Sequence, residues 1–137
     1  MPVIYEQHQG FIDFSNEVLQ LNHTLESCKT ITQLSDKGAI ECVVLFTRAS
    51  EFDIHLSIAS NGKWRATKSF LKACYDYAFN ACGKRRITVV IEDDNVQSIQ
   101  FNERMGHIFE GKLLHMFGEK HGLVYRLLKE ECKCLSI

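Results

Sequence analysis

Residues 87–111 read ITVVIEDDNVQSIQFNERMGHIFEG. The β-branched run that opens this stretch predicts a buried strand, and the polar residues after it predict a turn. Asn95 can cap a helix through its side-chain oxygen, and Gly106 can end that helix. The apolar helix positions that we expect to face a sheet are Ile99, Phe101 and Met105. The stretch therefore predicts a strand, a turn, a short helix and a second strand that leads back into the sheet.

The composition is typical of one compact domain. The chain has 137 residues, of which 45% are hydrophobic and 24% are charged, and it contains a single proline. This length predicts one domain over residues 1–137. The formal charge of −1 gives no overall field that would attract nucleic acid or an anionic membrane. The longest apolar runs, 43–46 and 89–91, are far shorter than a membrane span, and we expect a soluble cytoplasmic protein.

The cysteine pattern does not favour a metal site. Six cysteines occur, at positions 28, 42, 74, 82, 132 and 134, and no two of them form a Cys-x-x-Cys pair. The spacing of Cys132 and Cys134 is tighter than that of the common zinc motifs. Cys42 in an apolar strand and Cys74 on a helix are ordinary core filling. We expect no metal, and reduced cytoplasmic thiols.

Hydrophobic periodicity predicts an alternation of strands and helices along the whole chain. The expected strands are 1–8, 39–47, 52–59, 87–91, 108–117 and 122–128, and the expected helices are 11–25, 65–82 and 95–105. Residues 26–38 fit either a short helix or a weak strand. In the hairpin of 39–47 and 52–59, Asp53, His55 and Ser57 are expected on one face of the second strand and Ile54 and Leu56 on the other. The fold class is therefore α+β, with helices on both faces of a sheet.

The spacing of residues 95–111 resembles that of the acetyl-CoA-dependent N-acetyltransferase (GNAT) superfamily, particularly its ribosomal-protein and amino-terminal acetyltransferase branch. The matching residues are Asn95, Ser98, Phe101, Glu103, Arg104 as a basic equivalent, Gly106, Glu110 and Gly111, whereas His107 replaces the usual aromatic residue. The resemblance covers residues 39–131 and implies a mixed, mostly antiparallel central sheet of about six or seven strands. The ending at 125–132 is similar to that of small acetyltransferase-like proteins encoded by bacteriophages.

The resemblance also implies acetyl-CoA as the cofactor, held in a loop between a strand and the helix that follows. The aligned loop residues are Asn61, Gly62, Lys63, Trp64, Arg65 and Ala66, and Ile58, Thr67 and Asn95 are expected to join the same site. Backbone N–H groups of this loop would cradle the pyrophosphate, with the charges of Lys63 and Arg65 beside it. Only Ala66 matches the usual loop pattern, and Trp64 stands where glycine is usual. A loop that no longer binds CoA is therefore the alternative.

Two residues are the candidates for proton transfer. The resemblance implies Ser98 as the proton donor, because Asn102 replaces the tyrosine that the superfamily often uses; a helix-capping hydroxyl is the alternative. His55 is the candidate base, because it lies on the polar face of its strand and titrates near neutral pH. The alternatives to His55 as base are Glu51, Asp53 and Glu110, and a purely structural role for His55 is also open. The histidines expected at the surface or in turns are His107, His115 and His121, with His115 near the acceptor groove.

The sequence thus predicts an N-acetyltransferase that moves an acetyl group to a primary amine by direct transfer. The amine would belong to a protein amino terminus, a lysine or a small molecule. The alternative is a catalytically inactive protein of the same fold that binds a host factor or forms part of a virion. A homodimer formed by the last strands is a further expectation, whereas Lys84-Arg85-Arg86 favours a solvated turn over a nucleic-acid site. If the protein is encoded by a phage, we expect it in the host cytoplasm or the virion.

Overall fold

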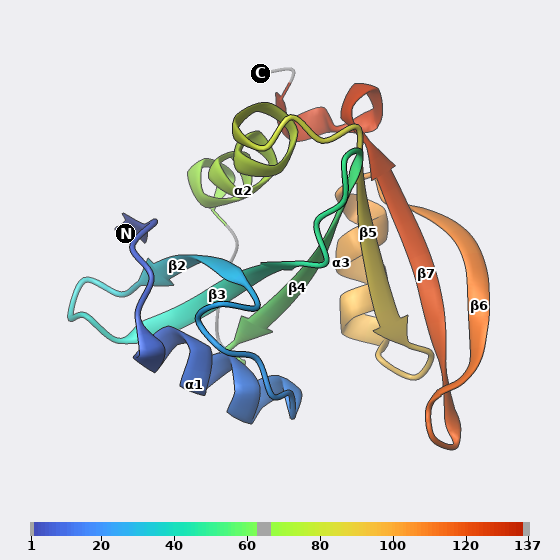
Figure 1. Cartoon of the computed structure of the whole chain (residues 1–137), viewed down its shortest axis with the longest axis horizontal. Helices are drawn as coiled ribbons and strands as arrows, with labels where there is room; N and C mark the ends of the chain where they lie inside the picture. The colour runs from blue at the N-terminus through green and yellow to red at the C-terminus, as the bar shows by residue number, and fades with distance from the viewer. Residues whose placement is uncertain (1, 63–66, 136–137) are drawn as a thin grey trace.

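The fold is a seven-stranded sheet with helices on both sides (Figure 1). The structure, a computed structural model, describes residues 2–62 and 67–135. The strands are β1 (Val3–Ile4), β2 (Lys29–Leu34), β3 (Ile40–Thr47), β4 (Asp53–Ser60), β5 (Arg86–Glu92), β6 (Ile108–Phe117) and β7 (Lys120–Leu128). The helices are α1 (Gln9–Leu19), α2 (Lys68–Asp76) and α3 (Val96–Arg104), followed after β7 by 3₁₀ turns at Lys129–Glu131 and Lys133–Leu135. The strand order β1-β2-β3-β4-β5-β7-β6 confirms the predicted mixed, mostly antiparallel sheet.

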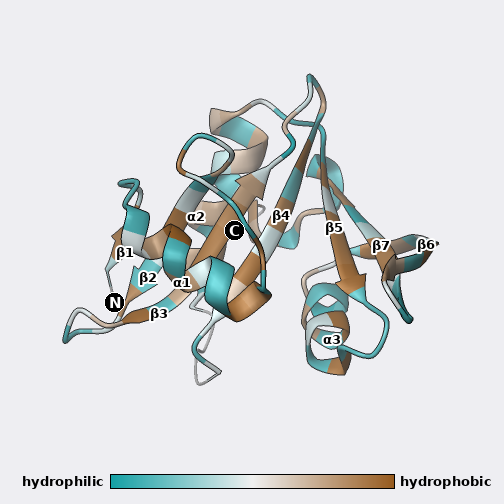
Figure 2. Ribbon diagram, turned by 60° about the horizontal axis from the view of Figure 1, so that its bottom comes forward, coloured by the Kyte–Doolittle hydropathy of each residue, from teal (hydrophilic) through white to brown (hydrophobic). Residues whose placement is uncertain are grey.

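β4 and β5 form the one parallel pair among the described strands, and they pair over a very short length. The paired residues are Asp53 with Arg86, Ile54 with Ile87 and His55 with Thr88. Beyond these pairs the two strands diverge, which Figures 1 and 2 show from two directions. β4 keeps its ladder with β3 as far as Ser60, and β5 keeps its ladder with β7 as far as Glu92. The sheet therefore has two halves that join at one end and open at the other.

Each face of the sheet has its own apolar core. On one face, Phe11 and Ile12 of α1 pack against Val43 and Leu45 of β3. We call this the α1 face. On the opposite face, which we call the α3 face, α2 and α3 pack against both halves of the sheet. Buried residues of that core include Val44, Ile54, Phe70, Ile87 and Leu127.

The alternation predicted for β4 is confirmed by these two cores. Ile54 and Leu56 are buried in the core of the α3 face. Since neighbouring residues of a strand point to opposite faces, Asp53, His55 and Ser57 belong to the α1 face. His55 pairs with Thr47 at the end of β3, close to the point where β4 leaves β5. The fold thus places the candidate base on the α1 face at the start of the opening.

α1 ends at Leu19, and the prediction of a helix to residue 25 is wrong. Gln20 has a left-handed backbone with a φ of 54°, which stops the helix. The Asn16 side chain then clamps the loop, because its oxygen accepts from the backbone N–H of His23 and its amide donates to the His23 carbonyl, both at 2.9 Å. Val18 and Leu25, two apolar residues of the predicted helix, are exposed. Side-chain hydrogen bonds to the backbone therefore override the helical pattern of residues 21–25.

The first strand and the last turn of the helix predicted over 65–82 also differ from the prediction. The first strand is confined to Val3–Ile4 among the described residues, and the undecided segment 26–38 contains β2. The helix predicted over 65–82 begins as α2 at Lys68, where the Thr67 hydroxyl accepts from the Phe70 N–H at 3.2 Å. Its last turn, Tyr77–Ala81, is π-helical rather than α-helical. The start predicted at residue 65 lies outside the described residues.

α3 confirms the prediction made from residues 87–111. Asn95 caps the helix, since its Oδ1 accepts from the Ser98 N–H at 3.2 Å. Gly106 follows the helix with a φ of 96°, a left-handed conformation that glycine adopts without a steric penalty. Ile99, Phe101 and Met105 pack against the core of the α3 face, as expected from their spacing.

All six cysteines are free thiols. Cys42 and Cys74 are buried in the core, as the core-filling interpretation predicts, and burial raises the pKa of both. Within the described residues, no three His, Cys, Asp or Glu side chains are grouped so that they could hold a metal ion. None of the described helices combines the length and the apolar composition that crossing a membrane requires.

Candidate active site

The opening between β4 and β5 forms a cleft of about 320 Å³. Residues that are far apart in the sequence line this cleft. They come from α1 and its loop (Leu19, Leu21, His23), the end of β3 (Thr47, Arg48), β4 (His55–Ile58), β5 (Val89–Glu92), α3 and its cap (Asn95, Ser98, Asn102) and the end of β6 (Met116, Phe117). The lining therefore includes side chains from both faces of the sheet.

Backbone groups of β4 face the cleft where its pairing with β5 ends. The Phe52 carbonyl accepts from the Arg86 N–H at 3.1 Å, so even-numbered residues of β4 direct their backbone groups toward β5. The Asn61 N–H donates to the Glu41 carbonyl of β3 at 3.0 Å, so odd-numbered residues face β3. Ile58 therefore turns its N–H and carbonyl into the cleft, beyond the last β4–β5 pair. Such groups can bind the amides or the carbonyl oxygen of a ligand.

His55 lies at the base of the cleft on the α1 face. Its Nε2 is 3.5 Å from Oδ2 of Asp53, and the Thr88 hydroxyl donates to Oδ1 of Asp53 at 2.7 Å. Burial lowers the pKa of His55; Asp53 opposes this effect, and the positive charges of Arg48 and Arg86 add to it. The ring is therefore mostly neutral at pH 7 and can accept a proton.

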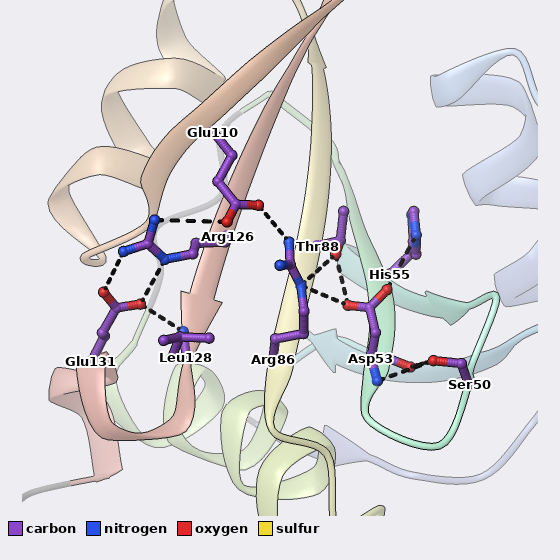
Figure 3. A network of polar contacts seen from close by, with 9 residues as sticks. All are labelled: Ser50, Asp53, His55, Arg86, Thr88, Glu110, Arg126, Leu128 and Glu131. Atoms are coloured by element: carbon purple, nitrogen blue, oxygen red, sulfur yellow. Dashed lines mark hydrogen bonds and ion pairs between the residues drawn. The ribbon is translucent and has the colours of Figure 1, made fainter.

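A chain of ion pairs holds the strands together at the closed end of the cleft (Figure 3). Arg86 Nε lies 3.3 Å from Asp53 Oδ1, and its Nη2 lies 2.8 Å from Glu110 of β6. Arg126 of β7 continues the chain from Glu110 at 3.7 Å to Glu131 at 3.0 Å. These contacts connect β4, β5, β6 and β7 with the turn after β7. They fix the strand end that carries His55.

The α3 wall of the cleft carries a hydroxyl and two amides. The buried Asn102 donates from Nδ2 to the Ser98 carbonyl at 2.8 Å and lies 3.4 Å from Ser98 Oγ. The side-chain oxygen of Asn95 accepts the hydrogen bond from the Ser98 N–H that caps α3. Ser98 lies on the α3 face and His55 on the α1 face. The cleft thus presents a proton acceptor and a hydroxyl on opposite faces of the sheet.

Solved structures with this architecture include several N-acetyltransferases. Spermidine N-acetyltransferase from Vibrio cholerae, in complex with CoA and spermine, superposes with a TM-score of 0.75 at 9% identity over 95% of this chain and 96% of that chain. Ribosomal-protein-S5-alanine acetyltransferase from Vibrio fischeri gives a TM-score of 0.71 at 13% identity over 96% and 94%. The chain has the GNAT fold. No family model and no curated protein matches the sequence.

The GNAT fold accounts for the resemblance found in residues 95–111. These residues form the cap and body of α3, the glycine that ends it and the start of β6. At this low identity the likeness extends to the fold alone. Which of the predicted residues serve a site therefore has to be judged from the cleft itself.

The GNAT fold brings some of the predicted site residues together. Those that line the cleft are His55, Ile58, Asn95 and Ser98. Asn61 and Gly62, the first two residues of the predicted cofactor loop, directly follow β4, and Thr67, just after the loop, caps α2. Lys63, Trp64, Arg65 and Ala66 lie outside the described residues. The alternatives Glu51 and Glu110 do not line the cleft, and Asp53 contacts His55 instead.

Two residues that the sequence did not single out line the α1 face of the cleft. Arg48 directly follows Thr47, the residue that pairs with His55, and has a left-handed φ of 49°. His23 is presented by the loop that Asn16 clamps. Neither residue belongs to a motif, and both reach the cleft through loop conformations. The one sequence signal was for Arg48, which directly follows the strand predicted over 39–47.

The expectation of a surface position for His107 is wrong. Its ring is buried, and its Nε2 lies 2.9 Å from the Tyr75 hydroxyl. Burial lowers the pKa of His107 to about 4. The His107 ring packs beside the Tyr75 ring in the interior. An aromatic side chain, which is usual at this position in the GNAT superfamily, would suit the same place. His115 and His121 lie in the β6–β7 hairpin, as predicted, and neither lines the cleft.

Proposed function

We propose that this chain is an acetyl-CoA-dependent N-acetyltransferase that moves an acetyl group to a primary amine by direct transfer. The observation that carries the proposal is the cleft between β4 and β5, where the Ile58 backbone, His55 and Ser98 meet. Solved proteins of the same fold are N-acetyltransferases, and one of them was solved with CoA and spermine. Because side chains of both sheet faces line the cleft, we place donor and acceptor on opposite sides of it.

The residues present fit the thioester arm of acetyl-CoA. Ile58 offers an N–H and a carbonyl beyond the end of the ladder, where an extended amide chain can pair with them. Gly62 has a φ of 83° and starts the connection from β4 to α2 on the α3 face. The loop residues Lys63, Trp64, Arg65 and Ala66, together with Asn61, Thr67 and Asn95, are proposed to hold the phosphate end. The α1 face is then left for the amine.

Bound acetyl-CoA supplies an activated thioester, whose C–S bond is exchanged for the C–N bond of an amide while the amine proton is left for the thiol. His55 directs Nε2 toward Asp53, so Nδ1 holds the lone pair that accepts the amine proton. Asp53 stabilises the protonated ring and is itself held by Thr88 and Arg86. His55 acts on the α1 face, where the amine enters.

Two groups act on the other side of the reacting centre. The Ile58 N–H stabilises negative charge on a carbonyl oxygen placed beside it. The Ser98 hydroxyl donates a proton or a hydrogen bond on the α3 face. Base and acid thereby act on opposite sides of the reacting centre: His55 releases the amine proton to solvent, and a proton from solvent restores the Ser98 hydroxyl after it has protonated the CoA thiolate.

Thermal melting with and without acetyl-CoA tests the cofactor site. A ligand at about 100 times its Kd stabilises a protein by about 2.7 kcal/mol, or several degrees for a chain of this size. Ile58→Pro removes the N–H that faces the cleft and leaves the β3–β4 hydrogen bonds in place, whereas Ile58→Ala keeps that N–H. We expect the shift in the wild type and in Ile58→Ala, and its loss in a folded Ile58→Pro. No shift in the wild type at millimolar acetyl-CoA would contradict the proposal.

Release of the CoA thiol in the presence of amines then separates an enzyme from an inactive binding protein. Turnover with any primary amine supports the transferase. A protein that binds acetyl-CoA and releases no thiol with amino acids, peptides or polyamines would support the inactive alternative, such as a host-factor binder or a virion component. An origin in a phage stays a prediction.

A homodimer remains part of the proposal, and β6 is the surface that supports it. This edge strand exposes Phe109, Leu113 and Leu114, with exposed fractions of 51%, 41% and 71%. Exposed apolar patches of this kind are typical of interfaces. Sedimentation should give a dimer that Leu114→Glu converts to a monomer, and a wild-type monomer at high concentration would remove this part of the proposal.

A further inference from the structure

The carboxylates near the cleft are already engaged. Glu92 lines the cleft and lies 3.4 Å from Nζ of Lys120, which also pairs with Asp94 at 3.0 Å. Asp53, below the cleft, contacts His55 and Arg86. Glu92 is the sole carboxylate among the described residues that line the cleft. A polyamine carries several positive charges along its length and needs unpaired carboxylates to hold them. The cleft therefore does not suit the kind of ligand bound in the spermine complex.

The α1 face of the cleft offers a cation instead. Arg48 has no ion pair or side-chain hydrogen bond among residues 2–62 and 67–135, although it lines the cleft. It follows the residue that pairs with His55, and its charge lowers the pKa of the His55 ring. A guanidinium binds a carboxylate through two parallel hydrogen bonds. An anionic group on the acceptor would thus lie beside the base that receives the amine proton.

The rim on the same face is apolar. Leu19 is the last residue of α1 and Leu21 lies in the loop after it, whereas Met116 and Phe117 come from the end of β6. Met116 and Phe117 have exposed fractions of 46% and 39%, although they lie against the cleft. Burying such side chains against an apolar group of a ligand is favourable, and methionine adapts to different shapes.

We propose that the acceptor is a primary amine that carries a carboxylate and an apolar side chain close to its nitrogen. This proposal rests on the acetyltransferase function proposed above. Arg48 binds the carboxylate, the rim residues hold the apolar side chain, and His55 receives the proton of the amine. Two sources share this chemistry: a free apolar amino acid, and a peptide whose first residues are apolar and acidic.

Binding measured by ligand-observed NMR, with no acetyl-CoA in the sample, tests the proposal. The probes are methionine against methioninamide, the amidated dipeptide Met-Asp against Met-Asn, and spermidine. In at least one pair, we expect the probe with the carboxylate, methionine or Met-Asp, to bind at least about 10-fold more tightly than the probe without it. One charged hydrogen-bonded contact predicts a difference of this size. Preference within the first pair points to a free amino acid, and preference within the second pair alone points to a peptide.

Arg48→Gln should remove this preference, whereas Arg85→Gln, at an exposed arginine outside the cleft, should keep it. Equal binding of acidic and neutral probes, tightest binding of spermidine, no binding of any probe, or a preference that survives in Arg48→Gln would each overturn the proposal. Because acetyl-CoA is absent, these outcomes are independent of the melting shift that tests the transferase itself. If acetyl-CoA raises the melting temperature but the acidic probes show no preference, the acceptor proposal fails and the transferase proposal holds. If the acidic probes are preferred but acetyl-CoA gives no shift, the transferase proposal fails and the carboxylate site holds.

Discussion

At the closed end of the β4–β5 pair, backbone hydrogen bonds and ion pairs from Asp53 to Glu131 connect four strands. At the open end, the described parts of β4 and β5 are unpaired with each other, and the cleft is lined by half-exposed apolar side chains and the Ile58 backbone. The same two strands thus combine a rigid joint with a binding surface. The comparison teaches that the opening depends on the joint, because only a fixed closed end keeps the cleft residues in place.

Two histidines, His55 and His107, illustrate this difference. Burial lowers the pKa of both His55 and His107. His55 borders the open cleft, where a ligand can reach its ring. His107 is enclosed beside Tyr75, where its neutral form serves packing. The same physical cause therefore acts on one histidine that borders the cleft and is proposed as the base, and on another that is enclosed in the core.

The largest effect is expected from His55→Ala, which removes the proposed base at the border between the two ends. Without this proton acceptor, kcat for acetyl transfer should fall by about 10²- to 10⁴-fold, while the melting shift with acetyl-CoA stays. His8→Ala, at an exposed histidine outside the cleft, is the matched control. Thiol release measured at saturating acetyl-CoA gives the comparison. Unchanged turnover in His55→Ala would assign the proton transfer to another group.

Truncating a buried side chain to alanine should lower the free energy of unfolding more at the closed end than at the open end. Leu127→Ala at the fully buried closed end should lower the free energy of unfolding by about 2–5 kcal/mol. Val90→Ala, on the half-buried wall of the cleft, should lower it by about 1 kcal/mol or less. Urea unfolding of both variants measures the difference. Equal losses would show that the open end is packed as tightly as the joint.

The pH dependence of stability should report on His107. Its folded pKa of about 4 lies below the ordinary value of 6.5, so between these values the unfolded state binds more protons. The stability contributed by its neutral ring is complete above pH 6.5 and is lost as the pH falls toward 4. Between pH 7 and 5 the loss should be about 2 kcal/mol. His107→Gln should remove most of this slope in urea titrations, and an unchanged slope would assign it elsewhere.

A glycine pair gives a smaller and local test of the cleft wall. A Cβ at Gly122 would meet Val90 Cγ1 at 2.9 Å and Met116 Cβ at 3.1 Å, and both neighbours line the cleft. Gly122→Ala should therefore lower the free energy of unfolding by about 1–2 kcal/mol through overpacking. Gly111→Ala meets nothing within 4 Å and is the control. Equal melting temperatures of the two variants would contradict the close approach of Val90 and Met116.

The smallest effect is expected from the ion pairs themselves. Glu110→Gln removes one charge between Arg86 and Arg126, but all three side chains are partly exposed, with fractions near 30%. Solvent screening limits the loss of stability to about 1 kcal/mol or less, and salt should reduce it further. Melting curves at low and high ionic strength test this. A salt-independent loss of several kcal/mol would indicate that Glu110 has a packing role.

Local signals made part of this structure predictable. The cap at Asn95, the stop at Gly106 and the alternation along β4 depend on neighbouring residues, and the structure confirms each of them. The divergence of β4 from β5 and the clamp of Asn16 on His23 depend on contacts between distant segments, which periodicity does not report. For the same reason the sequence indicated His55 and Ser98 but missed Arg48, whose place in the cleft follows from a left-handed turn.

The most direct test of the central claim is an NMR titration of the amide-labelled protein with acetyl-CoA. We predict that the Ile58 N–H resonance shifts strongly as this group gains a hydrogen bond in the cleft, with smaller changes at Ser98 and at Asn95. Amides of the closed end, such as those of Arg126 and Leu127, should change little. Shifts confined to surfaces away from the β4–β5 opening, with Ile58 unaffected, would contradict the claim that this opening is the cofactor site.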